Sequence, residues 1–91
     1  MYKLTRSNRA NKKYKITTPE GKTIHFGQSG AEDYTTHNDP KRKESYLARH
    51  KPREDWTKSG IDTAGFWARW LLWNKLTIRE SMDDTRIRFN L

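Results

Sequence analysis

The segment from residue 64 to residue 73 constrains the fold of this chain more than any other part. It reads AGFWARWLLW, and a helix made from it would be apolar on nearly every side. Such a helix has to be covered all round, as the central helix of a core is. A helix lying on a membrane would need several cations along its polar face, and this segment offers only Arg69. We therefore expect residues 64–73 to form a buried central helix.

The remainder of the chain is far more polar. Apolar residues are 32% of the 91 residues, against roughly 45–50% in average globular proteins. Four Trp, four Tyr and three Phe compensate, because each can bury a large area. We expect one small domain with a compact aromatic core. The first 13 residues lack the apolar stretch of a secretory signal, and no apolar run is long enough to span a bilayer, so we expect neither export nor a transmembrane segment.

The residue types that support catalysis or metal binding are sparse. The chain has no cysteine, which excludes disulfides and zinc-thiolate sites. His25, His37 and His50 follow no metal-ligand spacing, and the acidic residues occur in adjacent pairs that seldom converge on one ion. We expect no metal, no cofactor, no small-molecule substrate and no enzymatic activity.

Alternating side chains predict a β-hairpin over residues 13–28. Tyr14 and Ile16 alternate with lysine and threonine before a Pro-Glu-Gly turn, and Ile24 and Phe26 alternate with polar residues after it. A period of two on both sides of a turn is typical of a hairpin. Because an isolated hairpin is only marginally stable, its apolar face is expected to pack on the helices.

The residues before the hairpin form a separate feature. Residues 1–12 are predicted to be a basic N-terminal arm, and 13–91 a single domain. Two alternatives stay open for the arm. It is a mobile terminus, or Tyr2 and Leu4 form a short edge strand.

Two helices and their connections are predicted after the hairpin. Residues 27–38 are expected to form a loop, after which Asp39 caps a helix that has Pro40 at its first position. Pro52 ends this helix, because the residue before a proline resists the α conformation. Residues 52–62 then connect it to the central helix.

The last helix has the clearest start signal. Thr77 and Glu80 match a capping box, and Ile78, Met82 and Phe89 fall on one helical face. The predicted fold is therefore α+β, with an N-terminal hairpin followed by three short helices, the tryptophan-rich one in the centre.

The formal net charge is +8, and it is unevenly distributed. Residues 1–58 hold 14 Lys and Arg against 7 Asp and Glu, whereas residues 59–91 hold 5 against 4. A positive field of this kind favours nucleic acid or an acidic protein surface. The arm and the first helix have the highest density of cations, which suits phosphate through counterion release and bidentate arginine contacts. The predicted nucleic-acid-binding residues are Arg6, Arg9, Lys12, Lys13, Lys41, Arg42, Lys43, Arg49, His50, Lys51, Arg53 and Arg69.

Residues 26–84 resemble a known group of proteins. The motifs that carry the resemblance are Tyr34-Thr35…His37, Arg42…Tyr46…Arg49-His50, Glu54-Asp55-Trp56, Ser59-Gly60 and the segment GFWARWLLWNK at 65–75. They are similar to a family of small, basic, functionally uncharacterised proteins of large DNA viruses of algae and amoebae and of some marine phages. The chain departs from that pattern at Leu76, where a proline is expected. The resemblance implies a viral setting, in the virion or the infected cell, and points to Arg42, Arg49, His50, Arg53 and Arg69 as shared binding residues.

Two functions are consistent with these features. The first is a non-enzymatic, virion-associated protein that binds nucleic acid, in the first place duplex DNA and without sequence specificity, because no residue that would read base edges can be identified. The second is a minor capsid or cement protein whose basic surface docks on an acidic face of a capsid protein. Whether the nucleic acid is DNA or RNA, and the oligomeric state, are left open.

Overall fold

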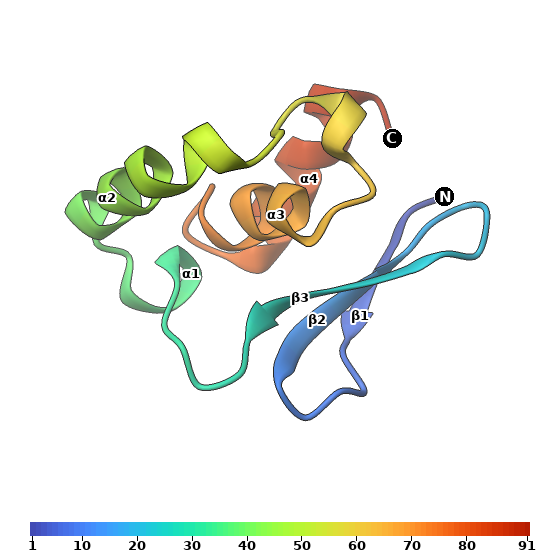
Figure 1. Ribbon diagram of the computed structural model, residues 1–91, viewed down its shortest axis with the longest axis horizontal. Coiled ribbons are helices and arrows are strands. Elements are labelled where there is room, and N and C mark those ends of the chain that lie inside the picture. Colours follow the sequence, from blue (N-terminus) through green and yellow to red (C-terminus); the bar gives the residue numbers. More distant parts are fainter.

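A computed structural model describes residues 1–91 (Figure 1). Three strands precede all the helices, and the helices pack on one face of the sheet that the strands form, so the α+β prediction is confirmed. Two elements, η1 and η2, are short 3-10 turns, and η3 is a π-helical turn. The elements are β1 (Lys3–Arg6), β2 (Lys12–Thr17), β3 (Thr23–Gln28), α1 (Tyr34–His37), α2 (Pro40–His50), η1 (Lys51–Arg53), η2 (Lys58–Gly60), α3 (Ala64–Trp67), η3 (Ala68–Leu72) and α4 (Ile78–Phe89).

The sheet is antiparallel in the order β1-β2-β3. The predicted hairpin is present as β2 and β3, with Ile16 opposite Ile24 and Tyr14 opposite Phe26. Ile16 and Phe26 are completely buried. Gly27 allows the end of β3 to approach the helices closely, because a Cβ atom there would lie 2.9 Å from Leu72 Cδ1 and the backbone φ is +78°.

The N-terminal arm is part of the sheet. Of the two alternatives, the edge strand is the one found: β1 pairs with β2, placing Leu4 opposite Ile16. Tyr2 packs its ring 5.7 Å from the ring of Trp67, and its carbonyl accepts a hydrogen bond from Arg86 in α4. The structure therefore has three strands where the sequence predicted two, and no domain boundary separates residue 12 from residue 13. The local sequence could not show the partners that order β1, since they lie far along the chain.

The tryptophan-rich segment is the centre of the core, as predicted, but it is not one regular α-helix. Its first turn is α3, and its second is the π-helical η3, a rare form in which each turn contains an extra residue. This turn leaves Trp70, Leu71 and Leu72 buried in succession. Thr63 starts the segment by accepting a hydrogen bond from Phe66 N.

The predicted helix starts are confirmed. Asp39 accepts hydrogen bonds from the first-turn amides of α2, with Pro40 at its first position, and Thr77 accepts one from Glu80 N at the start of α4. The predicted loop at 27–38 contains a further helical turn, α1, which Asp33 caps in the same way. A single turn held by one cap leaves no periodic apolar pattern, which is why the sequence did not reveal it.

The helices of this protein are short. Not one of them combines the length and the apolarity needed to cross a lipid bilayer. Trp56, in the connection before α3, packs against the core and accepts a hydrogen bond from Trp70 Nε1 at its carbonyl oxygen. It therefore covers one side of the core.

Replacing Trp70 by alanine tests this description of the core. Trp70 is 9% exposed, and Trp70→Ala should lower the free energy of unfolding by about 3–5 kcal/mol, because a large cavity replaces the ring. The matched control is Ile87→Ala on α4, where the side chain is 84% exposed and the loss should stay within about 0.5 kcal/mol. Urea unfolding followed by circular dichroism measures both, and equal losses in the two variants would contradict the assignment.

Candidate functional site

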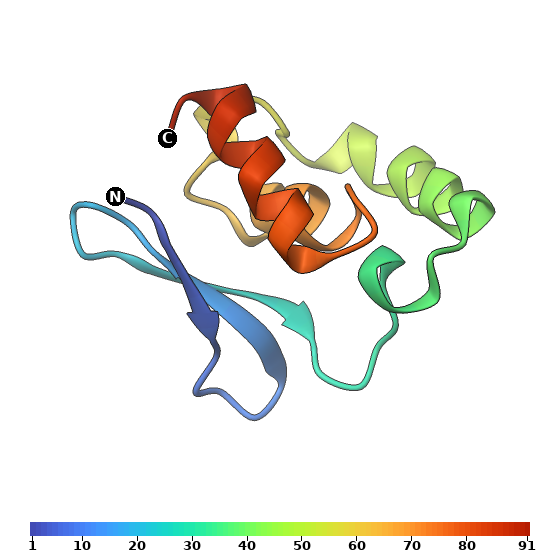
Figure 2. The same cartoon turned by 180° about the vertical axis from the view of Figure 1, so that it is seen from behind.

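The face of the sheet that points away from the helices is polar (Figure 2). The register places Thr5, Lys15 and His25 side by side across the three strands. Successive strand residues point to opposite faces, so these side chains lie on the outer face while Ile16 and Ile24 enter the core. This outer face is covered by no other part of the chain (Figures 1 and 2).

Cations gather around His25 on this outer face. Ser7 Oγ lies 2.7 Å from His25 Nδ1, so the turn between β1 and β2 folds onto the imidazole. The pKa of His25 is lowered by partial burial and then by the charges of Arg9, Lys15 and Lys12. Every charged group that shifts this pKa is a cation, so the potential at this end of the sheet is positive.

Sequence reasoning found only part of this group. Arg9 was predicted as a binding residue, whereas Lys3 was counted only as part of the basic arm and Lys15 as part of the hairpin. Lys3 and Lys15 lie on the same outer face by register. The sequence did contain a sign that the whole sheet is basic, because the first acidic residue of the chain is Glu20 and β3 contains none. By register Lys12, opposite Gln28, shares the face of Tyr14 instead. We refer to Lys3, Arg9 and Lys15 as the sheet cations.

The predicted cations of the first helix form a second group. Lys41, Arg42 and Arg49 line one side of α2, together with Ser45, and face a hollow that also contains Glu32. Arg42 forms an exposed ion pair with Glu32 at 3.3 Å. An exposed pair of this kind contributes little to stability, so Arg42 can exchange Glu32 for another anion. In η1, Lys51 and Arg53 are exposed and form no ion pair.

Four of the predicted residues have partners inside the protein. Lys13 Nζ forms an ion pair with the buried Asp33 at 2.6 Å, and Lys43 Nζ donates to Asn74 O at 2.7 Å. Burial lowers the pKa of Lys43, and the positive charges of Arg69 and Lys75 lower it further. These two lysines hold α1 and α2 in place, so they are not available to a ligand.

His50 and Arg69 are the other two. His50 Nδ1 lies 3.1 Å from a carboxylate oxygen of Glu54, whose other oxygen accepts a 2.8 Å hydrogen bond from Trp56 Nε1. Arg69 donates to Trp73 O at 2.8 Å, and its guanidinium lies 4.2 Å from the ring centre of Trp70. Burial and the nearby Arg88 lower the pKa of Arg69. Its role is to close the turn after η3 rather than to reach solvent.

The two exposed groups of cations do not form one continuous face. Figure 1 shows the turn between β1 and β2 at the lower end of the molecule and α2 at the upper left, with α1 and the segment before it between them. Arg6 is exposed but shares its face of the sheet with Tyr14. The sequence, which placed the arm next to the helix, could not show this separation.

The three histidines are also separated. His25 bonds Ser7 on the sheet, His37 packs against Trp73, and His50 contacts Glu54. No group of three or more His, Asp or Glu side chains comes close enough together to hold a metal ion.

Comparison with known proteins gives one match. A model of DUF5754, a family of unknown function, matches residues 2–50, more than half of the chain, and the chain belongs to this family. Neither a curated protein nor a solved structure matches it. The matched residues include the whole sheet and α2, and they end before the tryptophan-rich segment on which the viral resemblance depends. The viral setting therefore stays a prediction.

The titration of His25 tests the cation group around it. Its pKa should lie below the ordinary value of 6.5, and Arg9→Gln should raise it, because removing one positive neighbour makes protonation less costly. The pH dependence of the imidazole proton shifts in NMR measures both. Lys58→Gln, which removes an exposed charge elsewhere, should leave the titration unchanged. A pKa that does not respond to Arg9→Gln would show that these cations do not converge.

Proposed function

We propose that this member of the DUF5754 family binds nucleic acid, in the first place duplex DNA, through the cationic outer face of its sheet. The observation that carries the proposal is the register of the uncovered sheet face, to which Lys3, Lys15 and His25 belong. Arg9 adjoins them, because its N–H donates to Ser7 Oγ at 3.0 Å and Ser7 Oγ lies 2.7 Å from His25 Nδ1. The binding is non-enzymatic and independent of base sequence. The surface that binds the nucleic acid is the face of the sheet that the helices leave uncovered.

Phosphate backbones favour a surface of this composition. Each lysine or arginine that neutralises a phosphate releases condensed counterions, which supplies most of the affinity of non-specific binding. Hydroxyl groups on the same face, from Thr5, Thr17 and Thr23, can donate to phosphate oxygens between the cations. Sheets that present one face to a duplex are an established way of binding DNA. The paired positions on the outer face contain no Asn or Gln that would read base edges, and Gln28 shares the other face with Phe26.

The cations of α2 and η1 would act as a second phosphate-binding group. Lys41, Arg49, Lys51 and Arg53 are exposed and have no ion-pair partner. Because α2 and the outer sheet face lie on different sides of the molecule, one short duplex would not engage both at once (Figure 1). Two separate contacts on one small protein would allow it to bridge two segments of nucleic acid, as a protein that compacts a genome does. The setting we propose for this is a virion or an infected cell.

A duplex of about 30 base pairs, titrated over a series of salt concentrations, tests the proposal. The logarithm of the affinity should fall steeply with the logarithm of the salt concentration. Replacing Lys3, Arg9 and Lys15 by glutamine should weaken binding to every sequence and reduce that slope by about 3, roughly one for each phosphate that is no longer neutralised. All three side chains are at least partly exposed, so the variant should keep its fold.

The matched control replaces Lys58, Lys75 and Arg79, which are exposed on other elements, and removes the same charge. It should retain most of the slope. An equal loss in both variants would mean that net charge alone attracts the DNA. Absence of binding even at low salt would reject the proposal in favour of the docking of this surface on an acidic capsid protein.

A further inference from the structure

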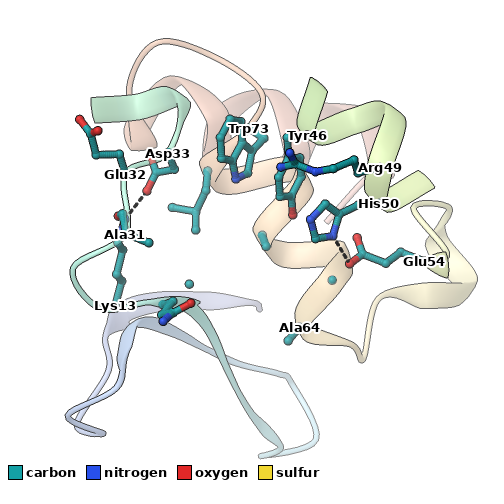
Figure 3. A pocket seen from close by; sticks show the side chains of 15 residues that line it. Lys13, Ala31, Glu32, Asp33, Tyr46, Arg49, His50, Glu54, Ala64 and Trp73 are labelled. Atoms are coloured by element: carbon teal, nitrogen blue, oxygen red, sulfur yellow. Dashed lines mark hydrogen bonds and ion pairs between the residues drawn. The ribbon is translucent and has the colours of Figure 1, made fainter. Parts of the chain in front are cut away.

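A groove separate from the outer sheet face runs between α2 and the segment that follows β3. It consists of two adjoining hollows of about 460 and 430 Å³, which share Glu32, Arg49 and Trp73 in their walls. Figure 3 shows the first, with Asp33 on one side and His50 and Glu54 on the other. Hollows of this volume are within the range of small-molecule sites. The proposed duplex contact of the sheet does not use them, and of the second phosphate-binding group only Lys41 and Arg49 line them.

The first hollow has an apolar wall and an aromatic edge. Leu72, Ala68 and Ala64 form part of the wall. Beside them, Tyr46 is stacked between two other rings, with its centre 4.2 Å from Trp73 and 4.1 Å from His50. Both faces of the Tyr46 ring are therefore covered, and the ladder presents ring edges to the hollow (Figure 3).

Those edges carry polar atoms that have no partner in the protein. Three of the four tryptophans donate their indole N–H to a protein oxygen, from Trp56 to Glu54, from Trp67 to Ile61 and from Trp70 to Trp56. Indole N–H groups usually find such an acceptor when they are buried. The indole N–H of the fourth, Trp73, has none and is not enclosed, because its ring lines both hollows.

Tyr46 and His50 add to this edge. The Tyr46 hydroxyl forms no hydrogen bond within the protein, and burial raises the pKa of Tyr46, so the hydroxyl stays protonated and can donate. His50 contacts Glu54 through Nδ1, which leaves Nε2 without a partner. Three unsatisfied polar groups thus meet an apolar wall, an arrangement that suits a planar ring with polar substituents.

The second hollow is cationic. Lys41, Arg42 and Arg49 line it from α2, with the Ser45 hydroxyl between them. Glu44 belongs to a different side of the helix and does not line it. The one acid present is Glu32, whose side chain is 62% exposed and pairs only with Arg42. Cations and a hydroxyl next to an apolar hollow match a ligand that has a phosphate joined to a flat, polar ring.

We propose that this groove binds one unpaired nucleotide, with its base in the first hollow and its phosphate at Arg49, Arg42 and Lys41 in the second. The inference rests on the proposed function and extends it from duplex phosphates to a single base. The nucleotide belongs to a single strand or is free in solution, and both sources have the same chemistry. The base would satisfy the Trp73 N–H and the Tyr46 hydroxyl, while Arg49, shared by both hollows, would contact the phosphate.

The indole N–H resonances of the four tryptophans test this directly. We expect a strand of about ten thymidine nucleotides to shift the Trp73 resonance and leave the three bonded indoles in place. An abasic strand of the same length and charge should bind about 10-fold more weakly and should not shift it, because it has no base to fill the first hollow or to form hydrogen bonds there. A thymidine monophosphate titration identifies the source: a shift assigns the site to free nucleotides, and a shift with the strand alone assigns it to single-stranded nucleic acid.

Three single variants sharpen the test. Arg49→Gln should weaken binding of the thymidine strand by about 10-fold, as expected when one charged group no longer reaches the phosphate. Lys58→Gln removes an exposed charge that lines neither hollow and belongs to neither proposed phosphate-binding group, and it should change the binding little. Glu32→Gln should strengthen binding, because it removes the only anion of the phosphate hollow.

The failure of this inference is distinguishable from failure of the proposed function. If abasic and thymidine strands bind equally, and neither they nor the monophosphate shift the Trp73 resonance, the groove does not hold a base. Duplex binding that still depends on Lys3, Arg9 and Lys15 would then leave the proposed function in place. The inference would also be overturned if Arg49→Gln and Lys58→Gln had the same effect.

Discussion

Phe66, Trp67 and Leu71 are completely buried where α3 and η3 meet the sheet, and the rest of the structure depends on this packing. Each such side chain contributes about 1.5–3 kcal/mol by leaving water. A chain with so few apolar residues has no second core to rely on. The N-terminal strand joins the sheet because Tyr2 and Leu4 add their side chains to the same cluster. One face of the sheet is therefore fully used by the core, and the other is left to solvent.

This one-sided packing divides the cations of the protein into two classes. Lys13, Lys43 and Arg69 point toward the covered side or its rim, and each has an oxygen partner within the protein. The partners of Lys13 and Lys43 lie in distant segments, whereas that of Arg69 closes the turn after η3. The sheet cations and those along α2 have no such task. Their positive field is unopposed around His25 and only partly opposed, by Glu32, at α2. The proposed contacts with phosphate use the second class only.

The tryptophans divide in a similar way. Three of them satisfy their N–H groups inside the protein and complete the core, whereas Trp73 closes the π-helical segment with its edge outside. In a regular α-helix each residue after Ala68 would be rotated about the helix axis by a larger angle than in the π-helical turn. The π-helical turn therefore affects the directions in which Leu72 and Trp73 point. The ladder from Trp73 to His50 then joins this segment to α2 and forms the wall of the groove (Figure 3).

The sequence by itself determined the elements whose signals are local. The alternation in β2 and β3, the caps at Asp39 and Thr77, and the apolar segment at 64–73 are all present as predicted, because periodicity and capping act over a few residues. It also determined the excess of positive charge in the first part of the chain. It left β1 as one of two alternatives, because the partners that order this strand are distant, and it did not reveal α1 or the π-helical turn.

Only the tertiary structure decided which cations can meet a ligand. Lys13 and Lys43 were indistinguishable from their neighbours in sequence, but folding brings Asp33 and the carbonyl of Asn74 to them. Lys15, which looked like an ordinary strand residue, lies on the uncovered face next to His25. The physical reason is that composition sets the amount of charge, whereas the availability of each charge depends on groups that come within hydrogen-bond distance only when the chain is folded.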